Sequence, residues 1–413
     1  MTRAAARVVS RRRRVGGGVA AALALFRYPE PVSAGPAPEG APRGFRAGGL
    51  DAVDAVVEHG VAARAFPGAV VAVGGVGGAP APRRGRGRLC PAARAPEART
   101  DTLYDLASLT KVIVTTTLAM MLVDDGKLDL DARVSTFFPG FRGGAKDGVT
   151  VRELLSHSGG LLWWAPLYKE VQGKAAYLQR IVAMDLAYEP GTKAVYSDLG
   201  VILLGDIVER QAGAALGELA RGRLLDPLGM TDTLYRPPAA LVSRIAPTEN
   251  DPWRGHLLRG EVHDENAFAL GGIAPHAGLF GTAPDLARFA AMLLSEGRAD
   301  GRRFVTRATL ELFTERAGVP QASRALGWDT PADESGRRSS TPGEPGYSAG
   351  GALVSARSFG HTGFTGTSIW MDPERELYVI LLTNRVHPTR ENNKIRAVRA
   401  EVADAAVRAL ADA

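Results

Sequence analysis

The sequence predicts an α/β (α+β) fold in which an antiparallel sheet, flanked by helices, carries an inserted all-α lobe. The valine-rich segment 68–75 is typical of a strand buried on both faces. Three β-rich runs at 358–364, 367–371 and 377–383 are separated by turn residues, which is typical of antiparallel hairpins. The long region between them, about 125–315, has mostly helical periodicity. We therefore expect one sheet built from both ends of the chain around a helical lobe.

Helices are expected where apolar residues recur at helical spacing or where a capping residue precedes such a run. Thr150 and Glu153 form a capping box that opens a short helix. The other expected helices span 49–65, 108–124, 174–186, 198–211, 216–225, 282–296, 306–315 and 392–411. Residues 79–99 are rich in Pro, Gly and Arg without alternation, so we expect an exposed loop there.

The N-terminal residues 1–34 have the pattern of a signal or targeting leader. An arginine-rich start is followed by the apolar stretch 15–26 and by a small-residue step that ends at Ala34. The apolar stretch is too short for a stable transmembrane segment. We expect a linker at 35–48, one compound domain at 49–413, and export to the periplasm or the medium. Without a functional signal the protein would be cytoplasmic.

The charge and cysteine content exclude several classes of function. The leader holds seven arginines against one glutamate, which equals the whole net charge of +6, so the rest of the chain is formally neutral. A nucleic-acid-binding stripe is therefore not expected. Cys90 is the single cysteine, and the histidines form no close ligand pair, so we expect no metal and no cofactor. These histidines are assigned structural or loop roles: His157, His256, His263 and His276.

A Ser-x-x-Lys step opens the apolar run 108–124. On a helix Ser108 and Lys111 would share one face in the first turn, roughly 5–6 Å apart between their Cβ atoms. A desolvated, neutral lysine could take the serine hydroxyl proton and make the serine nucleophilic. Such steps also arise by chance, so the assignment depends on partners elsewhere in the chain.

Two later motifs fall where a serine nucleophile needs partners. Tyr196-Ser197-Asp198 precedes a helix, and its phenol could relay a proton, or could simply pack the loop. His361-Thr362-Gly363 lies on a predicted strand, whose edge could offer a backbone N–H to an oxyanion while Gly363 lets substrate approach closely. The alternative is a glycine-containing strand before a hairpin.

The three motifs, in this order and around a helical insert, resemble the penicillin-recognising serine hydrolases. The likeness is to the serine β-lactamase and penicillin-binding-protein family, in its class C β-lactamase-like branch with D,D-peptidases and family VIII esterases. It runs from about Leu50 to the C-terminus. Further segments carry it: 154–160, 262–267, 278–280 and 360–367.

This resemblance implies a β-lactamase/transpeptidase-like fold and a role for each motif. Ser108 would be the nucleophile, Lys111 and Tyr196 would share the acid/base work, and the N–H groups of Ser108 and Phe364 would form the oxyanion hole. The substrate-binding residues would be Asp198, His361, Thr362 and Gly363. Which side chain takes the serine proton stays open, because neutralising a lysine at pH 7 costs about 4.6 kcal/mol. A charged Lys111 would instead favour a Tyr196 phenolate.

Two residues depart from the family pattern. Asp198 stands where asparagine is usual, and His361 stands where lysine is usual. An aspartate only accepts hydrogen bonds and a histidine is mostly neutral at pH 7, so β-lactam binding should be weaker. An ion pair between Asp198 and His361 would restore some charge. A third departure is the loop 79–99, where the family usually has a second strand.

The function expected is acyl-serine hydrolysis of an ester or a small peptide-like amide, as in an esterase or a D,D-peptidase, with weak β-lactamase activity as a further option. The substrate would be a small molecule or peptidoglycan-like; the oligomeric state is left open. The alternatives are an acylated sensor without turnover and an inactive scaffold.

A G-x-S-x-G pentapeptide at 346–350 lacks the strand and helix of a nucleophile elbow. Trp163-Trp164 could line the cleft or pack the lobe, and His263 is expected to pin a loop rather than line the cleft.

Overall fold

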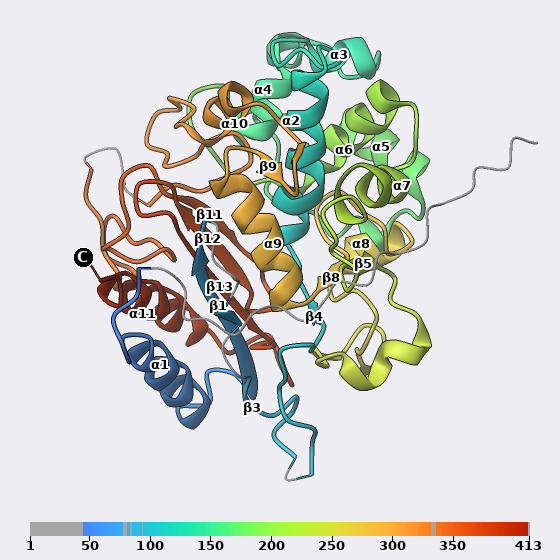
Figure 1. Ribbon diagram of the computed structural model, residues 1–413. Coiled ribbons are helices and arrows are strands. Elements are labelled where there is room, and N and C mark those ends of the chain that lie inside the picture. Colours follow the sequence, from blue (N-terminus) through green and yellow to red (C-terminus); the bar gives the residue numbers. More distant parts are fainter. Residues whose placement is uncertain (1–43, 77–80, 83–84, 93, 332–335, 412–413) are drawn as a thin grey trace, which may run out of the picture. The chain divides into compact units, whose positions relative to one another are not determined.

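The computed structural model describes residues 44–76, 81–82, 85–92, 94–331 and 336–411 (Figure 1). The predicted leader and most of the predicted linker lie outside these residues. In the described part of the chain no helix is long and apolar enough to cross a bilayer.

The central sheet has the strand order β11-β12-β13-β1-β2, with β3 also pairing with β1, and every pairing is antiparallel. The first long strand is therefore hydrogen-bonded to the last, with Val71 opposite Leu381. This confirms the expected sheet built from both ends of the chain. Its strands are β1 (Gly68–Gly75), β2 (Ala81–Pro82), β3 (Arg86–Gly87), β11 (Phe359–Thr362), β12 (Ser368–Asp372) and β13 (Leu377–Thr383). Because β2 and β3 belong to the sheet, the expected loop at 79–99 is only partly irregular.

Helices cover both faces of this sheet, as Figure 1 shows. On one face α1 (Asp51–Ala62) and α11 (Ile395–Arg408) pack against the odd-numbered side chains of β1. On the other face α9 (Ala283–Leu294) packs against the alternate side chains, such as Val70. A strand buried on both faces explains the continuous apolar run in β1.

The region between the two parts of the sheet is mostly helical. The segment after Ser108 begins as a π-helix, η1 (Lys111–Thr116), and continues as α2 (Thr117–Asp124); both are nearly fully buried. The other helices are α3 (Val134–Phe137), η2 (Gly144–Gly148), α4 (Val151–Leu155), η3 (Leu167–Lys169), α5 (Lys174–Ala183), α6 (Asp198–Ala212), α7 (Leu216–Leu219), η4 (Ala220–Leu225), η5 (Ala239–Arg244), α8 (Glu265–Ala269) and α10 (Arg307–Thr314). The expected capping box at Thr150 is present.

The helical region also contains short paired strands, which the sequence pattern did not predict. They are β5 (Leu234–Tyr235), β6 (Asn250–Asp251), β7 (His256–Leu257), β8 (Leu279–Gly281), β9 (Arg298–Ala299) and β10 (Arg302–Arg303). β8 pairs with β5 and with β4 (Tyr104–Asp105). This small sheet fixes the segment that leads directly into Ser108.

Candidate active site

Ser108 and Lys111 meet as the sequence predicted. Ser108 follows Ala107, whose φ of +47° is unusual for a residue with a side chain and marks a strained turn. Lys111 Nζ lies 3.0 Å from Ser108 Oγ, 2.8 Å from the carbonyl oxygen of His276 and 2.7 Å from Oδ1 of Asp198. The first two contacts are hydrogen bonds, and the third is an ion pair.

The surroundings of Lys111 favour its charged form. Burial lowers its pKa, but the Asp198 carboxylate and the Tyr196 side chain raise it, and the net result is a pKa above the ordinary value. Desolvation alone would favour the neutral amine, and the nearby aspartate reverses that direction. Of the two proton-transfer schemes left open by the sequence, this arrangement fits the one with a charged Lys111.

Tyr196 lies beside this lysine, with its ring centre 5.0 Å from Lys111 Nζ. Its hydroxyl oxygen is buried and makes no hydrogen bond of standard geometry within the described residues. Burial raises the pKa of Tyr196, Lys111 lowers it and Asp198 raises it, with a net increase. At neutral pH the side chain is therefore a phenol, and not the phenolate that was expected beside a charged Lys111.

The second motif is held at the start of α6 by its middle residue. Ser197 Oγ accepts a hydrogen bond from Gly200 N–H at 3.1 Å and donates to the Leu162 carbonyl at 2.6 Å. This is an N-cap, which leaves the neighbouring Tyr196 outside the helix and places Asp198 in its first turn. The cap therefore aims both side chains at Lys111.

His157 contributes to the site although the sequence reasoning gave it only a structural or loop role. Its Nδ1 accepts a hydrogen bond from Ser197 N–H at 3.1 Å, and its ring lies 4.8 Å from the Tyr196 ring. Burial, with the positive charges of Arg324 and Lys111 nearby, holds the pKa of His157 well below its usual range. The segment 154–160 carried family likeness, but nothing local indicated this contact.

His361 is buried on β11, with its ring centre 5.8 Å from that of Tyr196. Its Nδ1 lies 2.9 Å from the Thr362 carbonyl oxygen and donates to it, which leaves Nε2 as an unpartnered acceptor among the described residues. Burial lowers the pKa of His361 to about 4, so the ring is neutral. The ion pair considered between His361 and Asp198 is not the one observed, because Asp198 pairs with Lys111.

Gly363 is required by the packing of the protein itself. A Cβ atom at this position would lie 2.1 Å from Thr367 Oγ1 and 2.5 Å from the Leu106 carbonyl oxygen. Close approach of the chain is therefore one reason for the glycine, and close approach of substrate stays a prediction. Thr365 Oγ1 donates to the Asp105 carbonyl at 2.7 Å and Thr367 Oγ1 to that of Leu106 at 3.0 Å. The turn 363–367 is thus fastened to the segment that precedes Ser108.

The two N–H groups predicted to form an oxyanion hole have no acceptor in the part of the chain that the structure describes. Neither the N–H of Ser108 nor that of Phe364 donates a hydrogen bond within the described residues. The Phe364 carbonyl accepts from Arg385 Nε at 2.7 Å, which fixes this part of the turn. Both donors therefore remain available to a ligand.

The comparisons with known proteins show which family the chain belongs to. The family model described as Beta-lactamase matches residues 53–404. The chain belongs to the beta-lactamase family. It is 32% identical over 320 residues to an Escherichia coli K12 protein named D-alanyl-D-alanine carboxypeptidase, covering 70% of this chain and 71% of the relative. It is 34% identical over 318 residues to the Bacillus subtilis N-acetylmuramyl-L-alanine amidase, covering 70% and 69%.

Solved structures support the same fold. EstCE1, described as a hydrolase with promiscuous acyltransferase activity, matches with a TM-score of 0.68 at 21% identity over 87% of this chain and 98% of its own. A class C beta-lactamase matches with a TM-score of 0.66 at 21% identity over 86% and 97%. Membership of the beta-lactamase family, with relatives that carry hydrolase names, makes the protein a serine hydrolase.

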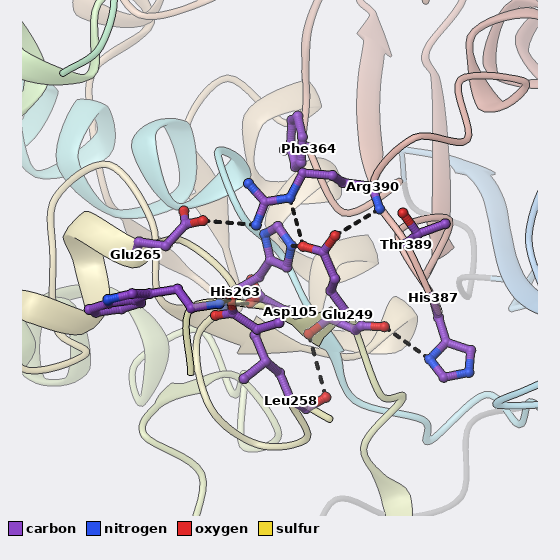
Figure 2. Close-up of polar contacts among 12 residues, drawn as sticks. Asp105, Glu249, Leu258, His263, Glu265, Phe364, His387, Thr389 and Arg390 are labelled. Carbon is purple, nitrogen blue, oxygen red and sulfur yellow. Dashed lines mark hydrogen bonds and ion pairs between the residues drawn. The ribbon is translucent and has the colours of Figure 1, made fainter. Parts of the chain in front are cut away.

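A buried network of charged side chains lies next to the two oxyanion donors of the protein (Figure 2). The ring of His263 stacks against the half-exposed ring of Phe364, with centres 5.6 Å apart. His263 Nε2 lies 2.8 Å from Glu249 Oε2, and Arg390 joins Glu249 at 2.7 Å and Glu265 at 2.8 Å. His263 and Arg390 lower the pKa of Glu249 to about 2 against the effect of burial. His263 therefore both pins its loop, as predicted, and supports a wall of the site.

Asp105 connects this loop to the nucleophile. Its carboxylate accepts from Ala107 N–H at 2.8 Å and from His263 N–H at 2.7 Å. His276 Nε2 lies 3.0 Å from Asp264 Oδ1, and this contact holds the residue whose carbonyl oxygen accepts a hydrogen bond from Lys111 Nζ. Among the described residues no group of three His, Cys, Asp or Glu side chains could hold a metal ion.

Trp163 borders the start of α6. Its carbonyl accepts from Asp198 N–H at 2.9 Å, and its side chain is 60% exposed. A ring this exposed is not packed into the core of the lobe, and a role as a cleft wall stays a prediction. The ring centre of Trp164 lies 5.8 Å from that of Trp163 and 6.4 Å from that of Tyr168.

Proposed function

We propose that the protein hydrolyses an ester or a small peptide-like amide through an acyl intermediate on Ser108. One observation carries this proposal: Lys111 Nζ lies 3.0 Å from Ser108 Oγ and 2.7 Å from Asp198, with Tyr196 against it. The N–H groups of Ser108 and Phe364, which have no acceptor among the described residues, add the means to stabilise an oxyanion.

In the proposed reaction Lys111 stays charged and Tyr196 moves the proton. In the reactive form of the site Tyr196 has lost its proton. The Tyr196 phenolate takes the proton of Ser108 Oγ as Oγ attacks the substrate carbonyl carbon. The charge that develops on the carbonyl oxygen is held by the N–H groups of Ser108 and Phe364. Tyr196 then gives its proton to the leaving oxygen or nitrogen as that bond breaks. In the second half a water molecule attacks the acyl carbon and loses its proton to Tyr196. The bond between the acyl carbon and Ser108 Oγ then breaks, and Tyr196 returns the proton to Oγ.

The charges around the site support substrates without an essential carboxylate. Lys111 is neutralised by Asp198, His361 is neutral, and Arg324 lies 2.6 Å from Asp329. None of these groups offers an uncompensated positive charge to an anionic substrate. Esters and neutral amides should therefore react better than β-lactams. The relatives' names, a carboxypeptidase and an amidase, keep peptidoglycan-derived amides within the proposal.

We also propose that the protein is exported, because of the leader pattern at 1–34. Fractionation of cells that express the full chain tests this. Enrichment in the periplasm or medium is expected, and retention of the full-length chain in the cytoplasm would contradict it.

A substrate panel tests the proposed chemistry. Purified protein is assayed with p-nitrophenyl butyrate, nitrocefin and diacetyl-Lys-D-Ala-D-Ala, and a fluorescent penicillin reports acylation. We expect kcat/KM to be greatest for the ester and least for nitrocefin. A penicillin label that never clears, with no ester turnover, would indicate an acylated sensor. Absence of both label and turnover would contradict an enzyme of this mechanism.

A further inference from the structure

A cation from α11 contacts the carbonyl side of the peptide that joins Gly363 to Phe364. Arg399 Nη2 donates to the Gly363 carbonyl oxygen at 2.6 Å and to that of Thr367 at 2.9 Å. Gly366 N–H also donates to the Gly363 oxygen, at 3.1 Å. The N–H of this same peptide belongs to Phe364 and is one of the two proposed oxyanion donors. Because the C=O and N–H groups share one delocalised amide, a charge at the oxygen acts on the donor.

We propose that Arg399 is a positioning residue for the oxyanion hole, and that its guanidinium orients and polarises the Gly363–Phe364 amide. This inference rests on the proposed function, since it assumes that Phe364 N–H faces the developing oxyanion. A cation at the carbonyl draws electron density away from the amide nitrogen, and hydrogen bonds in such a chain strengthen one another. Phe364 N–H is then a stronger donor, and its direction is fixed before substrate arrives.

The charge of Arg399 has no carboxylate to neutralise it among the residues that the structure describes. Within the described part of the chain no acidic side chain lies within ion-pair distance of its guanidinium, and its Nε atom is buried without a partner. Burial lowers the pKa of Arg399 to about 10, with a further decrease from Arg385 and Arg396, so the side chain is still charged at neutral pH. An uncompensated cation in a partly buried position is costly. If the hydrogen bonds to these carbonyl oxygens served only to hold the turn, a neutral donor side chain would be sufficient.

Arg385 provides an internal comparison. It donates through Nε to the carbonyl of Phe364, at 2.7 Å, and its Nη1 contacts the carbonyls of Arg390 and Asn392. It therefore holds the next peptide along the turn, whose N–H is not the proposed donor. If only rigidity of the turn mattered, Arg385 and Arg399 would be equivalent. If polarisation of the donor amide matters, Arg399 has the larger effect.

The test combines an ester substrate with a tetrahedral analogue. Phenylboronic acid forms a tetrahedral adduct with an active serine and places an oxygen in the oxyanion hole, so its Ki reports the strength of that hole. The variants are R399Q, which keeps a donor without charge, R399K, which keeps the charge, and R385Q. R396Q is the matched control, because Arg396 is exposed on the same helix and lies against Tyr347. Unfolding temperatures are measured for all of them.

We expect R399Q to lower kcat/KM for p-nitrophenyl butyrate by about 10–100-fold, mainly through kcat, and to raise the Ki of phenylboronic acid by a similar factor. R399K should stay within about threefold of the wild type, R385Q should lose less than R399Q, and R396Q should be unchanged. A folded R399Q with a Ki within about twofold of the wild type would overturn the inference. If R399Q is unfolded at the assay temperature, R399K provides the test. A Ki of phenylboronic acid that is raised about tenfold in R399K, without loss of thermal stability, would overturn the inference. Failure of the proposed function looks different, because the wild type would then neither turn over the ester nor bind the boronic acid.

Discussion

Lys111 Nζ lies 2.7 Å from Oδ1 of Asp198, so the amine beside the proposed nucleophile is held by a carboxylate from another helix. Lys111 begins η1, and Asp198 lies in the first turn of α6. The carboxylate raises the pKa of Lys111 and also that of Tyr196. This pair therefore sets the pH at which the site loses the proton that the reaction requires.

The D198N substitution should move the activity profile to lower pH. With both pKa values held high by Asp198, kcat/KM for p-nitrophenyl butyrate should rise with pH through the neutral range. Removing the carboxylate lowers the pKa of both Lys111 and Tyr196, so the rising limb should shift downward by about one pH unit or more. The measurement is kcat/KM from pH 5 to 10 for both proteins. An unshifted limb would show that Asp198 does not control the reacting proton.

The same variant should change substrate preference. Asparagine can donate a hydrogen bond to a substrate carbonyl, whereas the ionised aspartate only accepts. We expect D198N to acylate faster with nitrocefin relative to the ester, by about tenfold in the ratio of the two rates. D232N is a matched control, since Asp232 pairs with Arg244 away from the site. A ratio that does not change in D198N would remove Asp198 from substrate recognition.

Much of the fold could be predicted because it depends on local pattern. The apolar run of β1 and the alternating turn signals around β12 and β13 specify buried antiparallel strands wherever they occur in a chain. The π-helix at Lys111 and the two-residue strands β2 and β3 could not be predicted, because tertiary packing rather than local propensity selects them.

The site was predictable in its motifs but not in its contacts. Ser108 and Lys111 are three residues apart, so helical spacing alone brings them together. The Lys111–Asp198 ion pair, the His157–Tyr196 ring contact and the Arg399 contact to Gly363 join distant segments. The periodicity of a sequence does not predict such contacts. The possible ion pair between Asp198 and His361 is therefore not observed, and Asp198 pairs with Lys111.

Removing Lys111 alone should damage both activity and stability. K111M leaves Asp198 buried without its counter-ion, which should cost about 3–5 kcal/mol in the free energy of unfolding. It should also slow acylation by about 10²–10⁴-fold. The double variant K111M/D198N should recover most of the stability and none of the activity. Urea unfolding and ester turnover measure the two effects, and a stable single variant would contradict the ion pair's structural role.

The Y196F substitution should separate chemistry from packing. The Tyr196 hydroxyl makes no hydrogen bond of standard geometry within the described residues, so its removal should leave the unfolding temperature unchanged or slightly raised. Loss of the proton carrier should lower kcat for the ester by about 10²–10⁴-fold. Y188F is the control, because Tyr188 donates to the His157 carbonyl and its loss should affect stability more than chemistry. Near-wild-type turnover in Y196F would exclude the assigned role.

Acid should destabilise the fold through its buried histidines. The pKa of His361 is about 4 in the folded protein and that of His157 is well below its usual range, whereas the unfolded values are near 6.5. Below pH 6.5 the unfolded state therefore binds more protons, and stability present above that pH is lost as pH falls toward 4. Urea unfolding at several pH values measures this decline. H361N should flatten it, and an equally steep decline in H361N would assign the effect to other groups.

The most direct test of the account is intact-mass spectrometry of the protein after reaction with a fluorophosphonate, on the wild type and on S108A. We expect one adduct on the wild type, mapped by peptide analysis to Ser108, and none on S108A with its fold confirmed by circular dichroism. An adduct that persists in S108A, or that maps to Ser348 in the G-x-S-x-G segment, would contradict Ser108 as the nucleophile.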